Sequence, residues 1–218
     1  MNAISLEAVS GYLADKKGFP GNTVVLTFDD GFQNFYTTAF PVLEQYGFKA
    51  TVFLVTDYCG KKNNWPGNPP SLASHELMSW AEVRELRSNG IEFGAHTRTH
   101  PDLTRLTDVQ ARREIVESKD AIENAIGCPV RTFAYPYGKF NRPVMEIVSR
   151  NFEAACSTNL GTASVESDRF LLERIDAYYL SRPRVFDALP SKGFDRYMKF
   201  RQTLRDVKGR VAEKLPIS

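Results

Sequence analysis

The sequence of 218 residues contains no apolar run that approaches the roughly 18 residues needed by a membrane-spanning helix. Its first 19 residues also lack the basic start and the apolar centre of a secretory signal. With a formal net charge of only +2, the chain shows no excess of charge that would indicate a nucleic-acid partner. These absences predict a soluble, cytoplasmic protein that binds no nucleic acid. They leave its oligomeric state open.

Cysteine is scarce as well. The three cysteines, Cys59, Cys128 and Cys156, are odd in number and widely spaced, which argues against a disulfide framework and against a C-x-x-C metal site. Cys156 follows Ala154 and Ala155, and this apolar setting predicts a small core residue. We therefore expect the thiols to be structural.

Strand-like and helix-like segments alternate along most of the chain. Short apolar, β-branched or aromatic runs predict buried strands at residues 23–28, 50–55, 91–95, 132–135 and 152–157. Amphipathic patterns with stop signals predict helices at residues 35–46, 80–88, 108–126 and 143–150. A segment rich in Pro, Gly and Asn predicts a loop over residues 63–74. This alternation predicts an α/β domain with a parallel sheet or barrel over residues 1–190.

The C-terminal segment, residues 191–218, is basic and amphipathic. From Lys192 to the end it holds eight Lys or Arg and three Asp or Glu. Its apolar residues recur at spacings of three and four, as on one face of a helix; they are Tyr197, Phe200, Leu204, Val207 and Val211. The stripe predicts either a helix packed on the domain or one that docks onto an anionic membrane surface or a partner protein.

Two adjacent carboxylates, Asp29 and Asp30, directly follow the first predicted strand. In α/β folds the carboxyl ends of the strands carry the active site, and alternation sends neighbouring side chains in different directions. One carboxylate could bind a cation while the other transfers protons. A simple Asp-Gly turn, or a helix cap, explains the pair equally well.

His96 and His100 are two of only three histidines in the chain, and they follow another predicted strand. Imidazole is the commonest side-chain ligand of divalent metals. The threonines between the two histidines and Pro101 after them favour a loop over a helix. Two histidines with Asp30 provide three protein ligands and leave positions free for water and substrate, as in catalytic metal sites.

A third segment, Phe133-Ala134-Tyr135-Pro136-Tyr137-Gly138, is a strand that enters a turn. Its aromatic rings could simply pack in the core. Alternatively, the turn presents a backbone N–H and aromatic faces to a ligand, and such faces suit the apolar C–H surfaces of sugar rings.

The three motifs, in this order, resemble those of the polysaccharide deacetylase family, or NodB-homology domain. Residues 27–30 match its T-F-D-D motif and residues 96–100 its H-[ST]-x-x-H motif, and the resemblance extends from about Val24 to Asp176. It implies a distorted (β/α) barrel with fewer strands than the eight-stranded form. Some members have an earlier strand and helix that we expect this chain to lack, as in an N-terminally truncated domain.

The resemblance also implies roles for individual residues. Asp30, His96 and His100 would bind a divalent metal, with zinc expected. Asp29 would be the base that accepts a proton from the attacking water. The backbone N–H of Tyr137 would stabilise the oxyanion that forms on the acetyl group. The implied activity is removal of N-acetyl groups from a polysaccharide, oligosaccharide or glycolipid.

Two departures from the family pattern matter. In the family's R-x-P-Y motif an Arg orients the catalytic Asp, but that position is Ala134 here. Arg174 is the candidate replacement, and a surface salt bridge is the alternative role for it. The family's L-x-H motif, which supplies the general acid, has no match. The acid therefore stays unassigned between Asp29 itself and His75.

These departures keep two other functions open. The first is a metal-dependent deacylase that acts on a non-sugar amide or an O-acetyl ester. The second is a glycan-binding pseudoenzyme without turnover, although the intact metal motifs argue against it.

Overall fold

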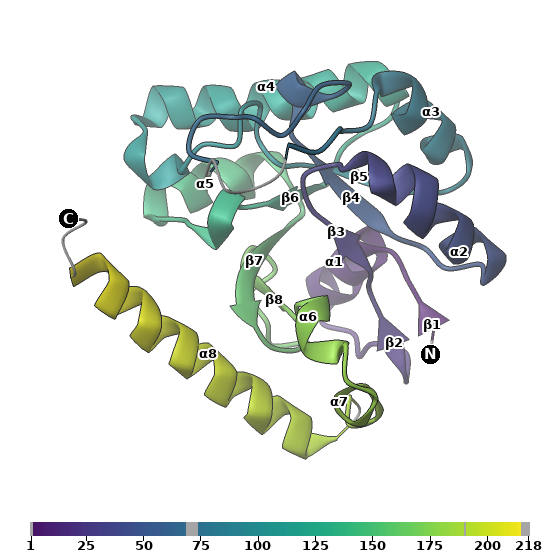
Figure 1. Cartoon of the computed structure of the whole chain (residues 1–218), viewed down its shortest axis with the longest axis vertical. Coiled ribbons are helices and arrows are strands. Elements are labelled where there is room, and N and C mark those ends of the chain that lie inside the picture. Colours follow the sequence, from purple (N-terminus) through teal and green to yellow (C-terminus); the bar gives the residue numbers. More distant parts are fainter. Residues whose placement is uncertain (1, 69–73, 190, 215–218) are drawn as a thin grey trace.

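A six-stranded parallel sheet forms the centre of the computed structural model, and its strands follow one another in chain order (Figure 1). The structure describes residues 2–68, 74–189 and 191–214, without the side chains of residue 192 and residues 208–214. The strands of the sheet are β3 (Thr27–Phe28), β4 (Thr51–Leu54), β5 (Glu92–Ala95), β6 (Thr132–Ala134), β7 (Ala154–Leu160) and β8 (Leu172–Arg174). The sheet is curled into part of a barrel, which confirms the predicted fold class.

Successive residues of these strands enter two separate cores. On one face Val52, Leu54 and Phe133 pack against the helices that connect the strands. On the other face Phe53 and Ala134 pack in a second apolar cluster. Both faces are therefore buried, as the continuous apolar runs predicted.

All but the first of the connecting helices begin and end within one residue of the predicted bounds. They are α2 (Phe40–Gln45), α3 (Trp80–Ser88), α4 (Asp108–Ile126) and α5 (Arg142–Asn151). Ser79 and Thr107 form capping boxes at the starts of α3 and α4, and Gly127 ends α4 in the left-handed conformation. Figure 1 shows α3, α4 and α5 as a layer outside the sheet.

The first predicted strand, residues 23–28, is wrong in detail. It divides into β2 (Thr23–Val24), which pairs with β1 (Asn2–Ala3), and β3, which begins the main sheet. The predicted helix 35–46 likewise divides, because a π-helical turn, Phe35–Ala39, precedes α2.

Residues before Thr23 also correct the expected lack of an earlier strand and helix. They form β1 and α1 (Leu6–Ala14), and α1 begins at a Ser5 cap. Leu6, Val9 and Leu13 of α1 join the second cluster, against Phe53. This helix therefore covers the face of the curled sheet opposite α3–α5.

After β8 the described residues form three helices, α6 (Ala177–Leu180), α7 (Pro183–Asp187) and α8 (Lys192–Lys214). Phe194 and Met198 of α8 are buried against Leu160 of β7. The helix forms as predicted, but its predicted apolar stripe is not the packed face. In the described residues, no helix is long and apolar enough to cross a bilayer.

Candidate active site

The predicted carboxylates and histidines of the site lie in the loops that follow β3 and β5. Asp29 and Asp30 come directly after β3, and His96 comes directly after β5. Asp30 and Gly31 both adopt left-handed backbone conformations, with φ of 71° and 77°, so the Asp-Gly pair does form a turn. The turn places the Asp30 carboxylate beside the histidines.

Asp30, His96 and His100 form a cluster suited to a metal ion. One ligand atom from each lies within 4.8 Å of the other two. Oδ1 of Asp30 is 3.4 Å from Nε2 of His96 and 3.5 Å from Nε2 of His100. Both histidines are buried, with 2% and 6% of their surface exposed.

Hydrogen bonding in the cluster also fits a divalent ion. Among the described residues, Oδ1 of Asp30 is buried without a hydrogen-bond partner, which is costly unless a cation binds it. Nδ1 of His96 lies 2.7 Å from the carbonyl oxygen of Ala134 and donates to it, so Nε2 is free to be a ligand.

Opposing effects act on the two imidazoles. Burial lowers the pKa of His96, but the Asp30 and Asp29 carboxylates outweigh burial and raise it. Burial and the neighbouring His96 together lower the pKa of His100 to about 4. His100 is therefore neutral at pH 7, the form in which imidazole binds metals.

Asp29 is paired with Arg174 of β8. Nη1 and Nη2 of the guanidinium donate to Oδ1 and Oδ2 of Asp29 at 2.7 and 2.8 Å. Partial burial raises the pKa of Asp29, but the charge and hydrogen bonds of Arg174 outweigh it, so that pKa lies below its ordinary value. Asp29 is consequently ionised at neutral pH.

The same arginine also contacts strands β7 and β3. Nε of Arg174 donates to the carbonyl oxygen of Ser157 on β7, and Nη1 lies 3.3 Å from Oγ1 of Thr27 on β3. Ala134, which stands at the family's Arg position, packs instead in the cluster beneath α1. The contact with Asp29 thus comes from β8 and not from the β6 turn.

Aromatic rings enclose His100 on two sides. The ring centroid of His100 is 4.7 Å from that of Trp65 and 4.5 Å from that of Tyr137. Trp65 is buried, whereas Tyr137 is half-exposed. Trp65 lies in the segment predicted only as a loop, and its one available signal was a large apolar residue among polar ones.

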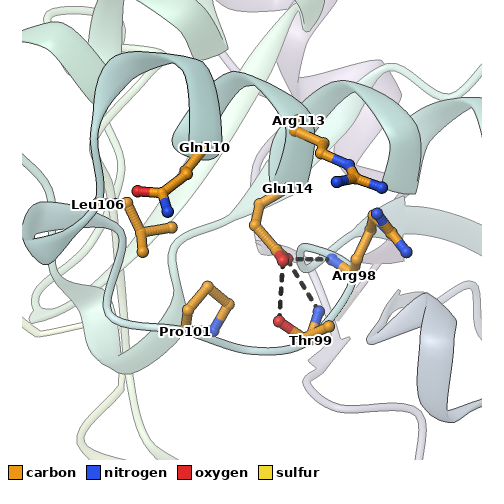
Figure 2. A pocket seen from close by; sticks show the side chains of 7 residues that line it. All are labelled: Arg98, Thr99, Pro101, Leu106, Gln110, Arg113 and Glu114. Atoms are coloured by element: carbon orange, nitrogen blue, oxygen red, sulfur yellow. Dashed lines mark hydrogen bonds between the residues drawn. The ribbon is translucent and has the colours of Figure 1, made fainter.

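The carboxylate of Glu114 on α4 holds the histidine loop, the segment from His96 to His100. Figure 2 shows Glu114 receiving hydrogen bonds from the backbone N–H groups of Arg98 and Thr99 and from Oγ1 of Thr99, all at 2.9 Å. These groups border a shallow hollow of about 350 Å³ beside the loop. Sequence reasoning missed Glu114, because nothing in the pattern of α4 separates it from surface glutamates.

Strained backbone is concentrated at the site. His100 and Tyr137 have φ of 57° and 58°, in the left-handed region where non-glycine residues are uncommon. The 3₁₀ turn Pro136–Gly138 brings Tyr137 against His100.

His75, the alternative general acid, is exposed. Its ring contacts the edge of Phe32, with centroids 5.9 Å apart.

Comparison with known proteins gives a consistent result. The sequence model of the polysaccharide deacetylase family matches residues 16–151. YxkH of Bacillus subtilis is 27% identical over 177 residues, which cover 81% of this chain and 56% of that protein. A Staphylococcus aureus protein, poly-β-1,6-N-acetyl-D-glucosamine N-deacetylase, is 24% identical over 148 residues, which cover 64% of this chain and 48% of the relative. This chain therefore spans about half the length of these curated relatives.

Solved structures share the fold. The Streptococcus pyogenes deacetylase PplD, in complex with acetate, superposes with a TM-score of 0.69 at 29% sequence identity. The match covers 79% of this chain and 72% of that one.

Proposed function

This chain belongs to the polysaccharide deacetylase family, and we propose that it is a metal-dependent hydrolase that removes N-acetyl groups from a sugar polymer, oligomer or glycolipid. One observation carries the proposal. A cluster of two histidines and a carboxylate, with ligand atoms within 4.8 Å of one another, lies beside a second carboxylate that Arg174 binds through both oxygens. We thus assign metal binding and proton transfer to different residues.

Asp30, His96 and His100 are the proposed ligands, and zinc is the proposed ion because two imidazoles and one carboxylate are a common zinc donor set. A divalent ion in such a site supplies a Lewis acid that polarises a carbonyl group and lowers the pKa of water. Three protein ligands leave coordination positions for water and substrate.

Asp29 is the proposed base. Its ionised carboxylate accepts a proton as water attacks the carbonyl carbon of the acetamide, and Arg174 fixes the direction of that carboxylate. The N–H of Tyr137 is the proposed donor to the carbonyl oxygen as it becomes negative. The C–N bond then breaks. We assign to Asp29 the return of its proton to the leaving nitrogen, because the alternative acid, His75, is exposed and packs against Phe32.

The substrate class is proposed from the relatives. One of them is a deacetylase of poly-β-1,6-N-acetylglucosamine, so β-linked N-acetylglucosamine oligomers are the first substrates to test. The half-exposed ring of Tyr137 beside His100 gives an apolar surface suited to a sugar face.

The test is acetate release by the metal-free chain after addition of Zn²⁺. The substrates are β-1,6- and β-1,4-linked N-acetylglucosamine oligomers, acetylated xylan and a simple aryl acetamide. Asp29→Asn should lower kcat by about 10²–10⁴-fold while the variant still binds Zn²⁺. Asp120→Asn, the same change at an exposed position on α4, should leave kcat unchanged.

Each other outcome contradicts a stated part of the proposal. Release only from xylan or the acetamide would assign the alternative deacylase activity. Bound Zn²⁺ without any release would favour the glycan-binding pseudoenzyme. Unchanged release by Asp29→Asn would remove that residue as the base.

A further inference from the structure

Among the described side chains of helix α8, those that contact the domain lie on one face. Phe194 and Met198 are buried in a cluster with Leu160. Oε1 of Gln202 accepts from the N–H of Leu160 at 2.8 Å, and Arg205 donates to the carbonyl oxygen of Thr158 at 3.1 Å. In Figure 1 the helix lies beside β7, apart from the layer of α3, α4 and α5.

A second, apolar face of α8 is exposed. Phe200, Leu204 and Val207 have 60%, 40% and 53% of their surface accessible, and Tyr197 at the edge of this face has 37%. Their spacings of three, four and three residues place them in one stripe along the helix. We call these four residues the exposed stripe.

Basic residues flank the exposed stripe. Arg196, four residues before Phe200, is exposed at one edge of the stripe, and Lys199 is exposed further round the helix on the same side. Arg201 contacts the ring of Tyr197 at the other edge of the stripe. The whole helix carries eight Lys or Arg against three Asp or Glu, whereas the rest of the chain carries 20 against 23. Positive charge is thus concentrated on the element that exposes the apolar stripe.

We propose that α8 binds an anionic phospholipid surface, with the exposed stripe in the interface and the flanking Lys and Arg on the headgroups. An apolar stripe bordered by basic residues is typical of helices that lie in the plane of a membrane. With 23 residues, α8 is roughly 35 Å long and can lie flat along the surface. A second copy is a poor occupant, because two helices with a local excess of five positive charges repel each other.

The proposal is independent of the deacetylase activity and is tested without substrate. The full chain is sedimented with vesicles of phosphatidylcholine alone and of phosphatidylcholine with phosphatidylglycerol in a two-to-one ratio. We expect binding to the anionic vesicles only, and weaker binding as salt is raised. Neutralising Arg196 and Lys199 together to Gln should lower the partition coefficient by about 10–30-fold, since each basic group contributes a factor of several.

The stripe has its own variant and matched controls. Changing Phe200, Leu204 and Val207 together to Ser should lower the partition coefficient by at least about 100-fold, because the apolar face is lost. The control triple, Val42, Tyr46 and Val109 to Ser, removes exposed apolar groups from other elements and should bind as the wild type does. Arg84→Gln with Arg112→Gln is the control for charge.

Circular dichroism and the melting temperature confirm that every variant is folded. Equal binding to both vesicle types, or binding to neither, would overturn the proposal. So would a dimer that the stripe variant dissociates while neither protein binds vesicles, since the stripe would then belong to a self-association interface.

Discussion

Arg174 binds both oxygens of Asp29, so the shape of its guanidinium matters as well as its charge. A lysine at this position keeps the charge but cannot donate two parallel hydrogen bonds. We expect Arg174→Lys to lower kcat by about 10–100-fold with a smaller change in KM, because Asp29 loses its fixed direction.

The measurement for Arg174→Lys is steady-state acetate release, with Zn²⁺ affinity determined in parallel. Arg142→Lys, at a position with 91% of its side chain exposed, serves as the control. An unchanged kcat in Arg174→Lys would show that charge alone suffices.

Two of the three thiols should be unreactive. Burial raises the pKa of both Cys59 and Cys156 to about 12, so about one molecule in 10⁴ carries either thiolate at pH 8. We expect a disulfide reagent to modify Cys128 alone in the native protein, and all three cysteines after denaturation. The Cys128→Ser variant should lose the fast reaction, and rapid labelling of Cys59 or Cys156 would contradict the prediction.

Single residues were predictable where the chemistry is local in sequence. His96 and His100 stand four apart after a strand, and Asp30 follows another strand, so spacing alone indicated a metal cluster. Trp65 and Glu114 reach the same region from a distant loop and from α4, and their contacts depend on packing that no local pattern encodes.

At the scale of elements, α4 fixes the histidine loop through Glu114. Its carboxylate receives three hydrogen bonds from Arg98 and Thr99. Glu114→Gln replaces one acceptor oxygen by a donor, so we expect Zn²⁺ affinity to fall by about 10-fold through misplacement of His96 and His100.

Isothermal titration with Zn²⁺ measures this effect. Glu146→Gln, which alters an exposed glutamate on α5 that pairs with Arg142, should bind Zn²⁺ as the wild type does. If Glu114→Gln lowers the melting temperature but leaves Zn²⁺ affinity unchanged, the role of Glu114 is stability alone.

Element boundaries were predictable where capping chemistry marks them. Thr107 and Gly127 delimit α4, and Ser79 begins α3. The division of residues 23–28 into β2 and β3 could not be predicted, because a single apolar run does not indicate that its two halves pair with different strands. On α8 the packed face consists of Phe194 and Met198, and these two residues form a shorter apolar pattern than the exposed stripe does.

At the scale of the whole molecule, a metal ion would join loops from separate strands. Any ligand that binds only the folded state stabilises it, by about 2.7 kcal/mol at 100 times its Kd. We therefore expect Zn²⁺ at that excess to raise the melting temperature of chelator-treated protein by roughly 5–10 °C. Asp30→Asn should abolish most of this rise, and an equal rise in the variant would place the ion elsewhere.

The fold class was predictable because alternating strands and helices allow few architectures. Neither α1 nor its position beneath the sheet was predicted, since a short amphipathic pattern before the first recognised strand is compatible with several surfaces. Tertiary packing decides between them.

The contact between Arg174 and Asp29 also has a kinetic consequence. It joins residues 145 apart in sequence, at the two edge strands β3 and β8. Within the sheet, by contrast, each strand pairs with the strand that precedes or follows it in the chain. Contacts of such high sequence separation form at a large entropic cost and usually late. In refolding experiments we expect helical circular dichroism to recover first and acetate release last. Recovery of catalytic activity would then mark the time at which the contact between β3 and β8 forms. Recovery of both signals in one phase would contradict this order.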